Sequence, residues 1–584
     1  MDARTAPAGT DRATQGRAIY RVPWRARSAV VVALLALLLL TFIVPPAIFL
    51  LSASLHTTHP DGSFDQLTLK FYAQLFASPF FLESLWNTFV YAVGSAVVAI
   101  ALGTIQALIV ERTDTPGRDY VFLGAIVSLG VPHLLYTVGW LLLLGKAGPV
   151  NDLLRTLSGG IAAPINVYSS WGMILIEGVS FVPMIFLLMS AVLKSIDTSL
   201  EEAAMASAAS PWRTFRRVTL PLCLPGVLAL LLLVFMRAFE SFEVPALVGL
   251  AGNITVLTTN IYLSVKEAGA ANFGMSGAYS VCLLLLMMLL LLGYTRLSRH
   301  AHRFQTITGK GYRPRVINLG RWRWVASGIL LALFVLVIAL PIGMVIFTSL
   351  QPFYEGLTFD SFDRFTLDNY RSVLAPGAFR DAIWNTLILG AATATLVVPI
   401  TALCSWLNVR RRPGAWILDQ IATAPLVFPA IVIGVAFLDV YVRLPVPLYG
   451  TLLSVIIAAA VRYLPYGMRF SHAGILQIHP DLEDASAVAG AGNVRIFLRI
   501  VVPLVSGALV GCWLFVFLGA SREVSMPLLL AGPGVEIVGP TLFDLWQNGQ
   551  LTELAAMGAL WAALMTVASA SFHGITRRFR IAPV

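Results

Sequence analysis

Six ionisable residues stand inside or at the ends of long apolar stretches of this 584-residue sequence, and they are the first candidates for chemistry. They are Glu177, Arg237, Glu240, Arg462, Arg522 and Glu523. A charged side chain in a bilayer is costly, so such residues usually line a water-filled path or pair with one another. Arg237 and Glu240 are spaced for pairing on a helix, and we favour that interpretation for them. For Glu177 and Arg462, a pathway role and a pairing or interfacial role stay equally open.

Motifs for catalysis are missing from the sequence. No GxxxxGK[ST], HExxH, CxxC or GxSxG pattern occurs, and Gly309-Lys310-Gly311 lacks the Ser or Thr that would hold Mg²⁺. His133 is more typical of a packed polar residue than of an ion ligand. His56 and His59 lie near Asp61, but two histidines and one acid in a loop are too little to assign an iron site. The sequence therefore predicts no enzyme, no resident metal and no cofactor of its own.

The composition identifies the solvent in which these residues must work. Hydrophobic residues make up 58% of the chain and charged residues only 12%, about half of the ~25% usual in soluble proteins. A membrane-spanning helix needs about 20 apolar residues, and about twelve such stretches are found. They lie near 28–52, 88–110, 120–144, 171–193, 222–240, 276–296, 324–349, 384–407, 415–440, 450–470, 504–520 and 555–576. The sequence predicts an all-α integral membrane protein.

Basic residues set the expected orientation. The net charge of +10 comes from arginines and lysines before the first span, between the sixth and seventh spans, and after the last span. Because positive residues collect on the cytoplasmic side, both termini are predicted to be cytoplasmic. The same distribution explains the excess of positive charge without invoking nucleic acid.

The chain contains an internal repeat. Ser63-Phe64-Asp65 and Trp86-Asn87-Thr88 recur 298 positions later as Ser361-Phe362-Asp363 and Trp384-Asn385-Thr386. Three prolines then recur with an offset of 282: Pro183, Pro221 and Pro245 as Pro465, Pro503 and Pro527. An even number of spans per copy makes the copies parallel repeats around a central pathway. The expected domains are a basic cytoplasmic tail (1–27), a six-helix unit (28–296), a basic cytoplasmic linker (297–323), a second six-helix unit (324–576) and a cytoplasmic tail (577–584).

Each copy also carries the same loop motif between its fourth and fifth spans. The first loop has Glu202, Ala203, Ala204, Ala208, Leu220 and Pro221, and the second has Asp484, Ala485, Ser486, Gly490, Val502 and Pro503. Both loops have an acid, two small residues, a further small residue and then an aliphatic-Pro pair at the same spacing. The small residues leave a narrow helix face that another protein can approach closely, and Pro211 or Gly490 is expected to turn the chain.

This pair of loops resembles the EAA loop of permease subunits of binding-protein-dependent ABC importers. The resemblance implies that each loop forms a coupling helix that docks into a groove on an ATPase subunit. Four departures from the family pattern stand out, namely Ala208 in place of Gly, Asp484 in place of Glu, Ser486 in place of Ala, and Val502 in place of Leu. These departures raise the hypothesis that the two ATPase contacts differ in strength.

The resemblance extends over nearly the whole chain and is strongest to the ferric-iron group of these permeases. It rests on 242–249, 256–262 and the linker 308–315. It implies a type I importer fold in the bacterial inner membrane, with two copies of a cytoplasmic ATPase that use the ATP. It also implies an extracytoplasmic solute-binding protein that docks on loops near 54–83, 145–170, 240–272 and 353–381. Ferric iron is the favoured substrate, with polyamine, thiamine or aminoethylphosphonate as alternatives.

A second hypothesis is a twelve-span secondary transporter driven by an ion gradient. Such transporters are also built from parallel six-helix repeats. Their charged motif between spans two and three is echoed only faintly by residues 111–118, and the second copy has Arg410-Arg411-Arg412-Pro413-Gly414 there. This run is what a plain positive-inside loop looks like, so the importer permease is preferred.

Overall fold

The chain is almost entirely helical in a computed structural model that describes residues 22–58, 64–161, 163–194, 198–266, 272–301, 317–357, 359–443 and 447–578. Within this part of the chain the strands β1 (His56–Thr58) and β2 (Phe64–Leu67) form one antiparallel hairpin, with His56 opposite Leu67. The remaining elements are α-helices with short 3₁₀ and π segments, as the composition predicts.

The first repeat runs from α1 to α13. Its elements are α1 (Val22–Leu55), α2 (Lys70–Ala77), α3 (Pro79–Arg112), α4 (Arg118–Gly130), α5 (His133–Leu144), α6 (Pro149–Leu157), α7 (Ser170–Ser180), α8 (Val182–Lys194), α9 (Thr198–Ala206), α10 (Pro211–Thr214), η1 (Phe215–Thr219), α11 (Leu220–Phe239), η2 (Pro245–Gly249), η3 (Leu250–Gly252), α12 (Leu257–Lys266) and α13 (Phe273–Ala301).

The second repeat runs from η5 to α27. Its elements are η5 (Gly320–Trp322), α14 (Arg323–Phe334), η6 (Val335–Ala339), α15 (Leu340–Ser349), η7 (Phe359–Arg364), α16 (Asp368–Leu374), α17 (Ala378–Val409), α18 (Ala415–Thr423), η8 (Ala424–Val427), α19 (Ala430–Arg443), α20 (Leu452–Leu476), α21 (Asp481–Val488), α22 (Asn493–Ile496), η9 (Phe497–Val501), α23 (Val502–Leu504), α24 (Ser506–Ser521), α25 (Pro527–Leu530), α26 (Val538–Gln547) and α27 (Leu551–Arg578).

Eight helices of the described chain are long and apolar enough to cross a membrane, and the number is up to 12 if each of four bent pairs is one span. The predicted spans 171–193 and 415–440 each correspond to a bent pair, and 504–520 corresponds to the second helix of the pair Asn493–Leu504 and Ser506–Ser521. The predicted span 120–144 is divided into α4 and α5 at Val131-Pro132, since a proline disfavours helix in the residue before it.

One structured segment falls where the sequence predicts an external loop. Pro245–Gly252 and Leu257–Lys266 form a pair of helices bent by 82°, the shape of a broken span or a re-entrant loop. All five residues of η2 are buried. The segment therefore packs inside the protein, and apolar residues alone could not distinguish this from a surface loop.

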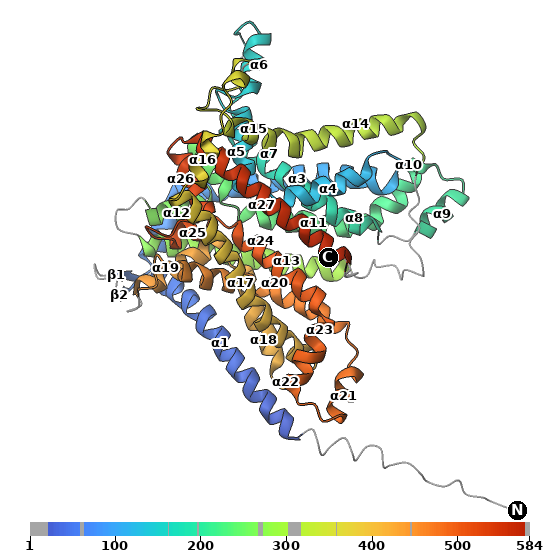
Figure 1. Cartoon of the computed structure of the whole chain (residues 1–584), viewed down its shortest axis with the longest axis vertical. Coiled ribbons are helices and arrows are strands. Elements are labelled where there is room, and N and C mark those ends of the chain that lie inside the picture. The colour runs from blue at the N-terminus through green and yellow to red at the C-terminus, as the bar shows by residue number, and fades with distance from the viewer. Residues whose placement is uncertain are drawn as a thin grey trace, which may run out of the picture.

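The first helix of each repeat packs against the other repeat. Helix α1 contacts α18 and α19, whereas α15 contacts α5. The last helices behave in the same way, because α13 contacts α19 and α27 contacts α4. In Figure 1 the blue α1 runs alongside the orange elements of the second repeat, and α14 lies over α3 and α4. The two repeats are interlocked rather than merely adjacent.

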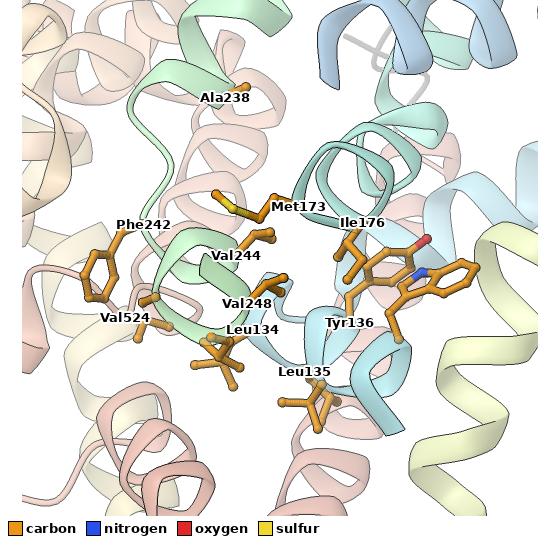
Figure 2. Packing of buried hydrophobic residues seen from close by; sticks show 14 of the residues in the cluster. Leu134, Leu135, Tyr136, Met173, Ile176, Ala238, Phe242, Val244, Val248 and Val524 are labelled. Atoms are coloured by element: carbon orange, nitrogen blue, oxygen red, sulfur yellow. The ribbon is translucent and has the colours of Figure 1, made fainter. Parts of the chain in front are cut away.

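The main core cluster crosses the boundary between the repeats. Phe242 and Tyr262 from the first repeat surround Phe543 from the second, with ring centroids 5.3 to 6.1 Å apart. Figure 2 shows Val524 of the second repeat among first-repeat side chains that include Leu134, Val244 and Val248. Aromatic packing of this kind adds to the burial of apolar surface and holds the two repeats together.

Three of the π-helical segments are explained by a proline. Segments η1, η6 and η9 each end just before an aliphatic-Pro pair: Leu220-Pro221, Leu340-Pro341 and Val502-Pro503. Proline has no backbone N–H, and its ring clashes with the carbonyl four residues earlier. A π turn opens the helix at that carbonyl and lets it continue. The aliphatic-Pro end of the loop motif is therefore accompanied by the same π turn in both repeats.

Candidate coupling loops and intramembrane charges

The first motif loop contains the short helix α9 at the edge of the molecule. Glu202 and Ala203 are exposed, Ala204 is half-buried, and the preceding Glu201 is buried. Ala208, Leu220 and Pro221 are exposed as well. The acid and the first small residue of the motif therefore face outward, where another protein can reach them.

The second loop repeats this burial pattern on α21. Asp484 and Ala485 are exposed, Ser486 is half-buried, and the preceding Glu483 is buried. Beyond the helix, Gly490 and Pro503 are exposed and Val502 is half-buried. In Figure 1, α9 and α21 both lie toward the right of the molecule, whereas α12, α16 and α26 lie toward the left. The two loops thus share one side of the protein.

Both loops turn through a residue with left-handed backbone geometry. Gly490 has φ +86° and Ala208, at the same place in the first loop, has φ +61°. The expectation that Pro211 turns the chain is wrong, because Pro211 is the first residue of α10. A proline is favourable at the first position of a helix, and the turn is already complete at Ala208.

Glu201 ties the first loop to the end of α3. Arg112, the last residue of α3, donates from Nη1 to Glu201 Oε2 at 3.3 Å and from Nη2 to the Leu193 carbonyl at 3.1 Å. Thr219 on η1 donates its hydroxyl to Glu201 Oε1 at 2.8 Å. The carboxylate therefore joins three elements: α9, α3 and η1.

Glu483 ties the second loop to the end of α17 in the equivalent way. Arg410 Nε donates to Glu483 Oε1 at 2.9 Å, and Arg410 Nη2 donates to the Ile478 carbonyl at 3.1 Å. Trp406, also near the end of α17, donates its indole N–H to Glu483 Oε2 at 3.0 Å. Sequence reasoning missed both carboxylates because they stand one residue before the motif. Their signal was an acid at 201 and 483 together with an arginine at 112 and 410, each pair related by the repeat offset.

Four of the six intramembrane charges form two ion pairs. Arg237 pairs with Glu240, and Arg462 Nε lies 3.0 Å from Glu523 Oε2. The pairs belong to different repeats, yet Arg237 interacts electrostatically with Arg462 and Glu523, and Arg462 with Glu240. A mixed cluster of charge therefore spans the boundary between the repeats.

The other two charges have different partners. Glu177 is fully buried and its Oε2 lies 2.7 Å from His133 Nε2. Arg522 donates from Nε to the Leu518 carbonyl at 3.1 Å. Glu243, which sequence reasoning did not select, interacts with His133, Glu177 and Glu523. The available signal was an acid three residues after Glu240.

No group of three or more His, Cys, Asp or Glu side chains in the described ranges is arranged to hold a metal ion. His59 and Asp61 lie outside the described residues. In the described chain the paired charges interact with one another.

The fold and the paired loops define a class: a polytopic membrane protein of two parallel helical repeats, each with a short helix presented on the same side. The chain matches the family described as the binding-protein-dependent transport system inner membrane component over residues 99–303 and again over 397–580. It belongs to that family. It is therefore a permease subunit of a binding-protein-dependent importer rather than a transporter driven by an ion gradient.

The chain is also similar to two permease relatives and to one solved structure. The chain is 25% identical to the ferric transport system permease protein FbpB of Actinobacillus pleuropneumoniae, over 83% of this chain and 69% of that protein. It is 26% identical to the spermidine/putrescine transport system permease protein PotB of Haemophilus influenzae, over 47% of this chain and 95% of that protein. A bacterial alginate ABC transporter in complex with alginate pentasaccharide-bound periplasmic protein is 19% identical with a TM-score of 0.41, covering 48% of this chain and 96% of that one.

Proposed function

We propose that this chain forms the pathway by which ferric iron, released from an extracytoplasmic binding protein, enters the cell. Support comes from the ferric transport permease that it resembles over 83% of its length. Iron is cargo in this proposal, so the pathway needs groups that pass a charged solute on rather than a site that retains it.

The observation that carries the energy-coupling half of the proposal is the loop pattern that occurs twice. In each repeat a short helix presents an acid and a small residue outward while the preceding acid is buried. The second loop also exposes apolar side chains, namely Leu482, Val488, Val494 and Leu498. Exposed apolar patches mark interaction sites. Each loop would dock on one of two ATPase subunits, which use the ATP.

The charge cluster between the repeats is the proposed constriction of the pathway. With the loops and both termini on the cytoplasmic side, as the basic residues predict, ATP binding would draw the two loops together. Movement of one repeat against the other then alternates access to the pathway. Separating the repeats would pull the Arg237–Glu240 pair away from the Arg462–Glu523 pair and expose charge to the solute.

Uptake into proteoliposomes tests the substrate. The chain would be reconstituted with its ATPase subunits and supplied with binding protein loaded with radioactive ferric iron, with ATP inside. We expect uptake that stops without internal ATP. Uptake of spermidine but not of iron would overturn the assignment to iron. Polyamine is the second candidate because of the similarity to the spermidine/putrescine permease, which covers 47% of this chain.

A further inference from the structure

Helices α3 and α17 make equivalent hydrogen bonds at both of their ends. At the loop end, the Arg112–Glu201 and Arg410–Glu483 contacts hold α9 and α21. The opposite end carries the repeated Trp-Asn-Thr sequence, which the coupling loops do not explain. The contacts made by that sequence decide what the two helices can transmit.

Thr88 on α3 caps the start of α12. Its hydroxyl accepts the N–H of Leu257, the first residue of α12, at 3.0 Å, and donates to the Ser84 carbonyl at 2.6 Å. Asn87 beside it donates from Nδ2 to the Thr255 carbonyl at 3.2 Å. The first N–H groups of a helix have no partner inside that helix. Thr88 therefore supplies from α3 an acceptor that α12 lacks at its own start, and Asn87 fastens the residue two positions before that helix.

Thr386 on α17 makes the same contacts with α26. Its hydroxyl accepts the N–H of Val538, the first residue of α26, at 2.9 Å and donates to the Ala382 carbonyl at 2.6 Å. Asn385 donates to the Glu536 carbonyl at 2.9 Å. Thr88 and Thr386 are buried, so water cannot replace these bonds without opening the packing.

The two attachment points are joined by α3 in the first repeat and, in the second, by α17, which contains Pro399 and is followed directly by Arg410. Thr88 precedes Arg112 by 24 residues, and Thr386 precedes Arg410 by the same number. At 1.5 Å per residue this is roughly 36 Å, more than the thickness of a bilayer's hydrocarbon core. The loop-end contacts are buried too, since the Arg112 and Glu201 side chains are 6% and 10% exposed and those of Arg410 and Glu483 are 11% and 10% exposed. Removing one partner of a buried ion pair is far more destabilising than breaking a surface pair, because it leaves a buried charge without a partner.

We propose that α3 and α17 are rigid transmission rods that couple the α12 and α26 segments on one side of the membrane to the coupling helices α9 and α21 on the other. Arg112, Glu201, Arg410 and Glu483 are positioning residues at one end, and Asn87, Thr88, Asn385 and Thr386 are positioning residues at the other. Docking of a loaded binding protein near α12 and α26 would thereby move α3 and α17 and, through them, the coupling helices α9 and α21 that contact the ATPase subunits. This inference rests on the proposed function, because it assumes the ATPase and binding-protein partners.

The test is the ratio of ATP hydrolysis with and without binding protein, measured on purified complexes of the chain with its ATPase subunits. The probe is binding protein loaded with ferric iron. Glu201→Gln and Glu483→Gln remove the charge at the loop end, and Thr88→Val and Thr386→Val remove the capping hydroxyl at the other. We expect the Glu→Gln variants and the Thr→Val variants each to lower the stimulation of ATP hydrolysis by binding protein by about tenfold, while the ATPase subunits still co-purify. Arg410→Lys, which keeps the charge but offers fewer donors, should retain part of the stimulation.

The control is Thr41→Val, which matches the Thr→Val changes but removes an exposed hydroxyl that donates only to the Leu37 carbonyl within α1, and it should leave the ratio unchanged. A purely structural role would lower the yield of assembled complex without changing the ratio in the complex that does assemble. Full stimulation in the Glu→Gln and Thr→Val variants would overturn the rod proposal while leaving the proposed function intact. Absence of stimulation in the unaltered chain would instead contradict the proposed function itself.

Discussion

At the scale of single residues, two consecutive acids in each motif loop have different surroundings: the first is buried and the second is exposed. The outward acid, Glu202 or Asp484, is free to meet a partner, whereas the acid just before it is buried against an arginine. Consecutive residues on a helix point about 100° apart, so one turn can present one acid to water and another to the protein. The sequence motif includes the exposed acid, Glu202 or Asp484, but not the buried acid before it, Glu201 or Glu483.

The left-handed turn after α9 leads to a residue-scale prediction. Ala208 holds φ +61°, a geometry that costs a non-glycine residue roughly 1–2 kcal/mol. Ala208→Gly should therefore stabilise the first loop by about 1 kcal/mol, which slows local hydrogen exchange of the α9 amides by about fivefold.

Gly490→Ala is the matched reverse change. A Cβ at Gly490 would meet no described atom within 4 Å. The variant should therefore destabilise the second loop only through its left-handed backbone geometry, and hydrogen exchange in α21 should become about fivefold faster. Faster exchange at α9 in Ala208→Gly would show that the turn is not strained.

The sequence predicts the position and spacing of two motif loops, and the structure has a short helix, α9 or α21, at each copy. The coupling role of these helices stays a prediction. The aliphatic-Pro pair that ends each motif follows the same π turn in both repeats. Arg112 and Glu201 are 89 residues apart, and only the packing of α3 against α7 and α8 brings them together. The sequence also could not predict the partners of Glu177 and Arg462. Their partners, His133 and Glu523, are 44 and 61 residues away along the chain and are brought close only by the fold.

At the scale of elements, one equivalent helix–helix contact is filled differently in the two repeats: the glycine is on the first helix of the pair in one repeat and on the second helix in the other. Gly103 on α3 faces Ile185 on α8, and a Cβ at Gly103 would lie 2.6 Å from Ile185 Cγ2. At the equivalent contact of the second repeat, Thr401 on α17 faces Gly467 on α20, where a Cβ would lie 2.7 Å from Thr401 Oγ1. One small and one larger residue fill the gap in each case.

Exchanging the pair in the first repeat should reproduce the packing of the second. Gly103→Thr alone should destabilise by about 1–3 kcal/mol through overpacking. Ile185→Gly alone should cost more than about 2 kcal/mol through the cavity it leaves. The double variant should be more stable than the sum of the two predicts, as measured by thermal unfolding in detergent. Strictly additive losses would mean that the two positions do not share one contact.

At the scale of the whole molecule, the repeats hold each other by more than the chain that joins them. Tyr354, which follows α15, donates its hydroxyl to the Leu142 carbonyl at 3.0 Å and to the Ala147 carbonyl at 3.2 Å, both in the first repeat. Burial raises the pKa of this phenol to about 12, so it remains a donor at physiological pH. With α1 and α14–α15 each packed on the opposite repeat, the interface is large and mostly apolar.

This interlocking predicts that the connecting chain is dispensable for assembly. Residues 1–308 and 309–584, expressed together as two polypeptides, should co-purify as one complex. Either polypeptide alone should be degraded, since its first helix would lack the surface that it covers. Recovery of a stable, monodisperse single repeat would show that the contacts between repeats are not needed for folding.

The most direct test of the whole account is ATP-driven uptake by a chain whose coupling helices have been altered. Replacing the outward residues in both loops with bulky ones (Glu202→Trp and Ala203→Trp, with Asp484→Trp and Ala485→Trp) should block ATPase docking without touching the buried Glu201 and Glu483. The account predicts that uptake falls to background and that the ATPase subunits no longer co-purify, while the permease stays folded. Undiminished uptake that collapses with an uncoupler and ignores vanadate would contradict it.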